Sequence, residues 1–140
     1  MSMGWFHSNV TWPVIQNSVA SAVCGAALFF GSGVVSDLSG CSSGVINDVA
    51  RGENLMLNGA AEEAKKVAVD AVVEAPHCGC AHALKAEANY ALMRAAVAHH
   101  KPDLAESLRA ECYADALLGG ELLSVSPSVM SLRTSCKARQ

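Results

Sequence analysis

Apolar and polar positions follow a helical period across the middle of the chain. From Glu53 to Ala75, small and apolar residues recur every three or four positions, while charged residues occupy the other faces. A spacing close to 3.6 residues is typical of an amphipathic helix, and Pro76 disfavours helical geometry in the residue before it. We therefore predict one helix over residues 53–75. Its inner face is Leu57, Ala60, Ala64, Ala68, Ala71 and Ala75.

The same period predicts a second helix after Pro76, from about Cys80 to His99. The basic residues around its end suit a helix C-terminus, where the backbone dipole favours positive charge. The residues expected to face inward are Leu84, Ala88, Ala91, Leu92 and Ala95.

A third helix is predicted to begin at Pro102, because proline suits the first position of a helix. Gly119 and Gly120 are expected to end it. Its inner face is Leu104, Leu108, Cys112 and Ala116. Short connections make successive helices antiparallel neighbours, so residues 53–120 are predicted to form an antiparallel bundle of about three helices. No segment alternates long enough to predict a strand, and the expected fold class is all-α.

The first 36 residues follow a different pattern, because Met1 to Ser36 contain no Asp, Glu, Lys or Arg. At 1.5 Å per residue, residues 14–35 would span roughly 33 Å as a helix, close to the thickness of the hydrocarbon core of a bilayer. Trp5, Phe6 and Trp12 precede this stretch, where aromatic residues of a membrane interface would lie. Residues 1–36 are therefore predicted to be an N-terminal transmembrane helix of a single-pass membrane protein.

Small residues recur at helical spacing inside this segment, at Ser21, Ala22, Gly25 and Ala26. Such a face lets two helix backbones approach closely in lipid. It predicts contact with other membrane-protein subunits as well as with lipid.

Two alternatives for this segment stay open. It would also suit the buried core helix of a soluble bundle. The sequence Leu38-Ser39-Gly40-Cys41 matches the cleavage site of a bacterial lipoprotein leader, in which Cys41 would be acylated. A secretory leader starts with positive charge, which this chain lacks, so we favour an uncut segment.

Composition agrees with a membrane or assembly context. The 140 residues carry ten Lys and Arg against thirteen Asp and Glu, a formal charge of −3. Charged residues make up 16% of the chain, below the roughly 25% of typical soluble domains. With no basic block and only 5% aromatic residues, nucleic acid is not an expected partner.

Two segments flank the predicted bundle. Residues 37–52, rich in glycine and serine, are predicted to be a connector with one helical turn. Residues 121–140 are serine-rich and carry Arg133, Lys137 and Arg139 without an acidic residue after Glu121. We predict a solvated basic tail, with an arm on an acidic partner or on anionic lipid headgroups as the alternative.

The densest candidate chemistry is the segment His77-Cys78-Gly79-Cys80-Ala81-His82. Thiolate and imidazole are ligands of zinc and of copper, so Cys78, Cys80 and His82 are candidate metal ligands. On a helix Cys80 would point about 200° away from Cys78, so only a loop gathers both thiols. The alternative is a pair of buried, inert cysteines beside exposed histidines.

The six cysteines also allow a disulfide framework. However, Cys24 lies inside the predicted span, and antiparallel pairing about Lys101 puts Cys112 level with residue 90, far from Cys80. We therefore expect mostly free thiols and a reducing environment. Arg51, the basic residue nearest the predicted span, lies on its C-terminal side and agrees with that orientation.

No pair of side chains is placed by sequence as an acid and a base, so an enzyme is not expected. The leading hypothesis is a non-catalytic accessory or structural subunit of a multi-protein membrane complex, with no cofactor, anchored by its N-terminal helix. The alternatives are a thiol and imidazole metal-binding module with zinc or copper, and a soluble helical interaction protein.

Overall fold

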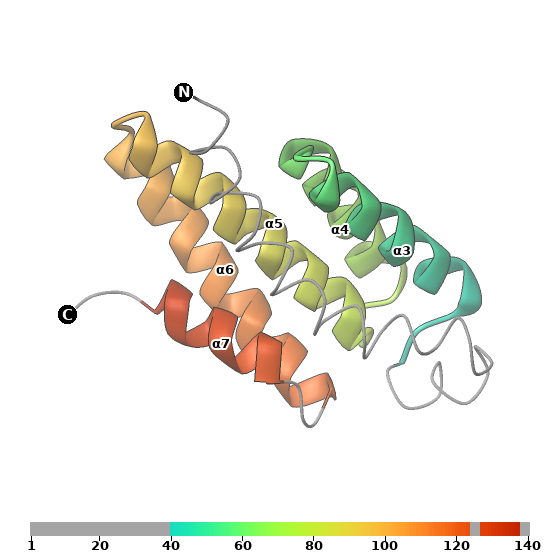
Figure 1. Cartoon of the computed structure of the whole chain (residues 1–140). Coiled ribbons are helices and arrows are strands. Elements are labelled where there is room, and N and C mark those ends of the chain that lie inside the picture. Colours follow the sequence, from blue (N-terminus) through green and yellow to red (C-terminus); the bar gives the residue numbers. More distant parts are fainter. Residues whose placement is uncertain (1–39, 124–126, 138–140) are drawn as a thin grey trace.

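The computed structural model describes residues 40–123 and 127–137, which form an all-α bundle without strands in these ranges (Figure 1). Its helices are α3 (Ser43–Leu57), α4 (Ala61–Glu74), α5 (Gly79–Ala98), α6 (Pro102–Leu123) and α7 (Pro127–Cys136). The predicted fold class is therefore confirmed for the bundle. The predicted transmembrane helix, with its face of Ser21, Ala22, Gly25 and Ala26, lies outside the described residues.

Helix α5 is the centre of the bundle, because it contacts α3, α4, α6 and α7. Figure 1 shows α3 and α4 on one side of it and α6 and α7 on the other. The sequence of α5 explains this position, since its first half consists largely of alanine and other small residues and is buried on nearly every side. The small side chains let neighbouring helices approach α5 from several sides, and the polar side chains of His82, Glu87 and Asn89 are buried there as well.

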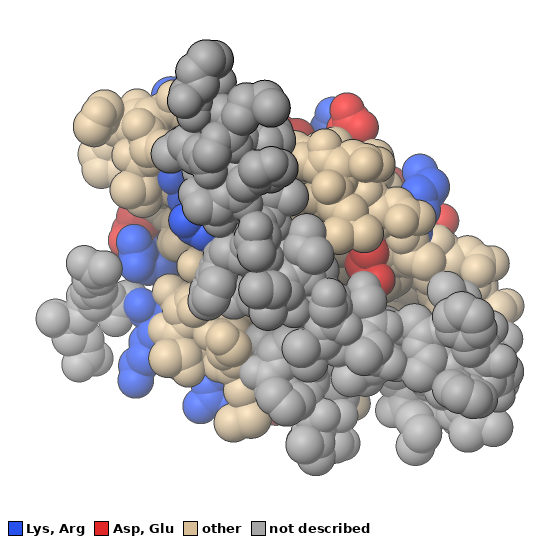
Figure 2. All heavy atoms as spheres, viewed as in Figure 1, with Lys and Arg blue, Asp and Glu red and all other residues tan. Residues whose placement is uncertain are grey.

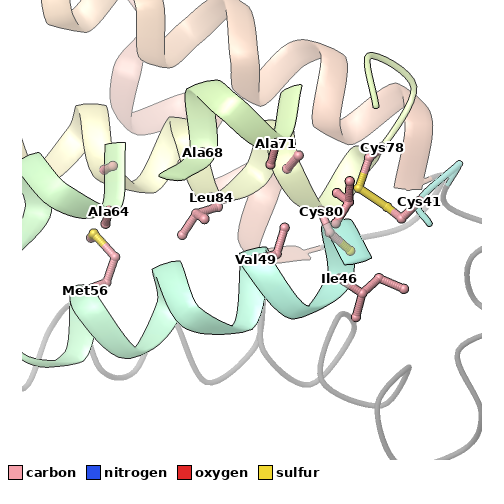
Figure 3. Packing of buried hydrophobic residues seen from close by; sticks show 13 residues of the cluster. Cys41, Ile46, Val49, Met56, Ala64, Ala68, Ala71, Cys78, Cys80 and Leu84 are labelled. Atoms are coloured by element: carbon pink, nitrogen blue, oxygen red, sulfur yellow. A yellow bond between two sulfur atoms is a disulfide. The ribbon is translucent and has the colours of Figure 1, made fainter. Parts of the chain in front are cut away.

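The described residues form three hydrophobic clusters around α5. The smallest joins α5 to α6 through Met93, Ala96, Ala105 and Leu108, and the two larger cores lie on either side of α5. The first joins α3, α4 and α5, with Leu84 of α5 among small and branched side chains of its neighbours (Figure 3). The second joins α5, α6 and α7 and contains Ala83, Ala86, Cys112, Ala116, Val129, Leu132 and Cys136. Alanine dominates both cores, so the helices can pack closely.

The structure corrects the prediction of a connector over residues 37–52 and one helix over residues 53–75. Helix α3 already begins at Ser43, where the Ser42 hydroxyl accepts a hydrogen bond from the Val45 backbone nitrogen at 3.3 Å. It ends at Leu57, and Gly59 then adopts a φ of +78°. A glycine in this left-handed conformation commonly ends a helix, which is why α3 and α4 are separate.

The second predicted helix is confirmed as α5, within one residue at each end. Leu84 and Ala88 of its predicted inner face are buried, Ala91 and Leu92 are half-buried, and Ala95 is exposed. The prediction is wrong at Ala95, because the buried surface of α5 turns toward several neighbours and does not follow a single face.

The third predicted helix begins at Pro102 as expected, but Gly119 and Gly120 do not end it. Helix α6 continues to Leu123, because Gly119 lies against α5. A Cβ at Gly119 would lie 3.3 Å from the Ala83 backbone nitrogen. The glycine therefore allows close packing rather than a helix end. Of its predicted inner face, Leu108, Cys112 and Ala116 are buried and Leu104 is 49% exposed.

The predicted solvated tail is also corrected, because residues 127–136 form helix α7. Val129, Leu132 and Cys136 are buried at helical spacing against α5 and α6. This short apolar face was not predicted, because the segment is rich in serine.

The expectation of free thiols is wrong. Cys41 is bonded to Cys78, with Cα atoms 4.6 Å apart, and Cys112 is bonded to Cys136, with Cα atoms 5.8 Å apart. Cys80 is disulfide-bonded as well, and no cysteine of the described ranges is free. The remaining cysteine of the sequence, Cys24, lies outside them.

The disulfide partners do not follow from the predicted helices, because two of them lie outside those helices. Cys41 precedes α3, and Cys136 ends a helix that was not predicted.

In residues 40–123 and 127–137, no helix is long and apolar enough to cross a membrane.

Candidate functional site

The predicted metal ligands lie where α4 turns into α5, but the structure directs them to different neighbours. Cys78 precedes α5 and is bonded to Cys41, while Cys80 is buried in the core of α3, α4 and α5 (Figure 3). His82 contacts Asp115 of α6 instead. Metal ions bind cysteine as the thiolate, and both sulfurs are held in disulfides here. No cluster of three or more potential metal ligands occurs among the described residues, so the metal hypothesis applies to a reduced chain.

His82 is the centre of a buried polar network. Its Nδ1 lies 3.2 Å from Oδ1 of Asp115, and its Nε2 lies 2.8 Å from the carbonyl oxygen of Pro76. Both neighbours only accept hydrogen bonds when Asp115 is ionised, so this geometry suits an imidazole that carries a hydrogen on each nitrogen. Lys85 completes the network, with its Nζ 3.2 Å from Oδ2 of Asp115.

The network raises the pKa of His82 above its ordinary value of 6.5. The hydrogen bond to Asp115 is the main cause, and the hydrogen bond to Pro76 adds to it. Burial and the nearby Lys85 act in the opposite direction. In its charged form, His82 ties α5 to α6 and to the turn before α5.

Sequence reasoning found His82 but missed Asp115, its partner. The available signal was the antiparallel pairing of two helices about Lys101, which brings Asp115 alongside the first half of α5. The direction in which His82 points depends on the fold around Pro76 and was not predictable from spacing.

Two other polar side chains of α5 are buried without hydrogen bonds. Both carboxylate oxygens of Glu87 and both amide atoms of Asn89 lack a partner within the described structure. Burial, together with the charge of Glu53 on α3, raises the pKa of Glu87 to about 8. Glu87 is therefore protonated at neutral pH, which avoids burying a charge.

A cleft of about 660 Å³ lies between α5, α6 and α7. We call it the basic cleft, because its charged residues are Arg94 of α5, Arg109 of α6 and Lys137 after α7. Tyr90, Met93, Val97, Ala98, Thr134 and Ser135 complete its described lining. Figure 2 shows Lys and Arg side chains gathered at the left of the molecule, where α6 and α7 lie in Figure 1.

A smaller cleft of about 240 Å³ lies between α4, α5 and α6. Glu62 and Lys65 line it together with His99 and Lys101, so both signs of charge are present. Lys65 also forms an ion pair with Glu111, with Nζ and Oε2 3.2 Å apart. The basic cleft is therefore the more selective of the two for an anion.

Comparisons with protein-family models, with curated proteins and with solved structures found no match to this chain.

Proposed function

We propose that the chain is a non-catalytic accessory subunit of a multi-protein membrane complex, anchored by one N-terminal helix. The observation that carries the proposal is the stretch from Met1 to Ser36, which has no Asp, Glu, Lys or Arg and whose residues 14–35 would be long enough as a helix to span a membrane. In this proposal the bundle of α3 to α7 is the part that docks onto other subunits outside the bilayer.

Exposed apolar side chains on the bundle support a docking role. Val73 is 76% exposed, and Val69 lies one turn before it on the outer side of α4. Other large apolar side chains that are exposed are Leu57, Val97, Leu104, Leu118 and Met130. Single exposed residues are common, but adjacent apolar side chains on one face favour contact with a partner.

The disulfides support an orientation for the bundle. Disulfides persist in oxidising compartments and are rare in the cytosol, so the bundle is proposed to lie on the extracytoplasmic side of the membrane. Arg51 near the predicted span favours the opposite orientation. A single positive charge is a weaker signal than two disulfides.

Membrane extraction tests the anchor. After washing membranes with alkaline carbonate, the full chain is expected in the pellet, and its release into the supernatant would contradict a membrane span. Purification in a gentle detergent should then retain the partner subunits, which mass spectrometry identifies.

Paired variants test the small-residue face. On an ideal helix, Ala20 lies opposite the face of Ser21, Ala22, Gly25 and Ala26. Gly25→Leu is expected to stay in the membrane but to lose co-purifying subunits, because a bulky side chain prevents close helix approach. The matched control, Ala20→Leu, should stay in the membrane and retain the co-purifying subunits. Equal recovery of partners with the two variants would refute this face as the contact.

A further inference from the structure

We propose that the basic cleft binds a phosphate group. Its three cations come from three separate elements, which places positive charge around one space rather than along one helix. The chain as a whole carries a formal charge of −3, so this concentration of positive charge runs against the overall balance. A cleft lined by one sign of charge attracts and concentrates ions of the opposite sign.

Two of the cations are oriented by their neighbours. The Arg94 guanidinium lies 5.9 Å from the centre of the Tyr90 ring, one turn earlier on α5, in a cation–π contact. The Arg109 side chain is only 19% exposed, and its buried Nε forms an ion pair with Oε2 of Glu106 at 3.3 Å, without hydrogen-bond geometry. Guanidinium groups present several donors in a fixed plane, which suits the oxygens of phosphate.

The third cation, Lys137, follows directly after Cys136. The disulfide between Cys136 and Cys112 attaches this end of α7 to α6, close in sequence to Arg109. The backbone segments that carry Arg109 and Lys137 are thus tied to each other before any ligand arrives. A site that is already organised spends less free energy on ordering when it binds.

Acidic side chains offset this charge only in part. None occurs among the described residues that line the cleft. The carboxylate nearest to Arg109 is Glu106, whose Oε2 lies 3.3 Å from Nε, and the Glu106 side chain is 65% exposed. Water reaches the Glu106 carboxylate but not Nε of Arg109, so the ion pair offsets part of the Arg109 charge, and the remaining guanidinium nitrogens of Arg109 are not part of it.

The other walls of the cleft indicate how the phosphate is presented. A volume of about 660 Å³ exceeds the needs of a bare phosphate ion, and Met93 and Val97 supply apolar surface beside the cations. The ligand chemistry is therefore a phosphate ester with an apolar or ring-shaped remainder. A soluble phosphate ester and a phospholipid headgroup share this chemistry, and the lipid source alone depends on the proposed membrane location.

The site is tested by titrating the full chain, in a non-ionic detergent, with inorganic phosphate. Binding is monitored through the amide chemical shifts in NMR spectra. Saturable shifts are expected around the basic cleft. Arg94→Gln, Arg109→Gln and Lys137→Gln are each expected to weaken binding by about tenfold, because each removes a charge-assisted hydrogen bond.

Arg133→Gln is the matched control. Arg133 lies on α7 and is exposed, and it is not among the residues that line the cleft. Its removal changes the net charge by the same amount, so binding should stay within about twofold of the wild type. Lys137 is exposed, so its variant is expected to fold, and dispersed amide spectra check this for every variant.

A second titration with short-chain phosphatidic acid distinguishes the sources. Tighter binding than inorganic phosphate, lost in Arg109→Gln, would assign the site to a lipid headgroup. Equal binding would assign the site to the phosphate group alone and would contradict the apolar remainder. The proposal is overturned if neither ligand gives saturable shifts, or if Arg133→Gln weakens binding as much as Arg109→Gln. Phosphate binding can hold even if the carbonate wash releases the chain, so the two proposals fail separately.

Discussion

At the scale of single residues, the His82 network predicts a pH-dependent stability. Because the folded pKa of His82 is raised above 6.5, its contribution is fully present below about pH 6.5 and is lost as the pH rises through the raised value. Asp115→Asn removes the main cause of this shift. It is expected to lower the free energy of unfolding by about 1–3 kcal/mol near pH 6, and by less at alkaline pH. Urea unfolding across a pH series measures this difference.

Asp70→Asn is the control for this prediction, because Asp70 is exposed on α4. It should change the free energy of unfolding by less than about 0.5 kcal/mol. An Asp115→Asn variant whose deficit is the same at every pH would contradict a charged His82.

Glu87 predicts a second pH effect with the same sign. Its pKa rises from 4.5 to about 8 on folding, so the folded state keeps a proton that the unfolded state loses between these values. The free energy of unfolding should therefore fall as the pH rises through this window. Glu87→Gln keeps the shape but does not ionise, and its urea-unfolding profile is expected to be flatter than that of the wild type.

The exposed Glu74 provides the comparison for Glu87. Glu74→Gln should leave the slope of the wild type in place. If Glu87→Gln also follows that slope, the buried carboxyl is not the source of the pH dependence.

Residue-scale prediction from sequence located the segment from His77 to His82 but not its chemistry. The sequence shows thiol and imidazole groups close together, which is the local requirement of a metal site. Cys78 forms a disulfide with Cys41, 37 positions away, and His82 contacts Asp115, 33 positions away. Such long-range partners follow from the packing of helices and not from local spacing.

At the scale of elements, two adjacent glycines of α6 have different roles. A Cβ at Gly119 would meet the α5 backbone at 3.3 Å, whereas one at Gly120 would meet only Val129 at 3.8 Å. Gly120→Ala is therefore expected to raise the free energy of unfolding by about 0.5–1 kcal/mol, because alanine is the better helix former. Gly119→Ala should have a lower free energy of unfolding than Gly120→Ala in the same thermal or urea unfolding experiment. Equal gains in the two variants would show that the α5–α6 contact is not tight.

Helix α7 provides a second prediction at this scale. Leu132 is 1% exposed in the core of α5, α6 and α7, whereas Met130 is 60% exposed on the same helix. Leu132→Ala is expected to lower the free energy of unfolding by about 2–5 kcal/mol, and Met130→Ala to change it by less than about 0.5 kcal/mol. If both variants unfold like the wild type, the segment is the solvated tail that its composition suggested.

The sequence predicted the elements whose signals are local. Helix α5 and the start of α6 follow from Pro76, Pro102 and a long alanine-rich period. The break between α3 and α4 was missed because the apolar spacing continues across Asn58 and Gly59, where the backbone turns. The extension of α6 was missed because a glycine that allows close packing looks the same in sequence as one that ends a helix.

At the scale of the whole molecule, the disulfides are expected to supply much of the stability of an alanine-rich bundle. The bonded cysteines are 37 and 24 positions apart. In the chain-entropy model, each bond of this span contributes about 3–4 kcal/mol. Reduction, or the double substitution Cys112→Ser with Cys136→Ser, should therefore lower the melting temperature markedly. Peptide mapping without reduction should recover Cys41 linked to Cys78, and Cys112 linked to Cys136.

A reducing agent supplies the control for this prediction. In its presence, the double variant and the wild type should unfold at similar temperatures, because neither then has the bond between α6 and α7. A wild-type chain that melts at the same temperature with and without the reducing agent would contradict the stabilising role.

The all-α class and the antiparallel order of successive helices were predictable, since both follow from periodicity and short connections. The oxidised state was not, because the cysteine partners lie at the margins of the bundle. Because the cysteines of the described ranges are oxidised and not free, we propose that the bundle lies on the extracytoplasmic side of the membrane.

The positions of the two mapped disulfides have a consequence for proteolysis. The bond from Cys41 to Cys78 encloses the turn at residues 58–60, whereas neither bond spans the turn at residues 99–101. A protease that nicks the first turn leaves the two pieces covalently joined, so a non-reducing gel shows one band. A nick at the second turn separates α3 to α5 from α6 and α7, and neither mapped disulfide joins the two halves, which are then held by the packing around α5.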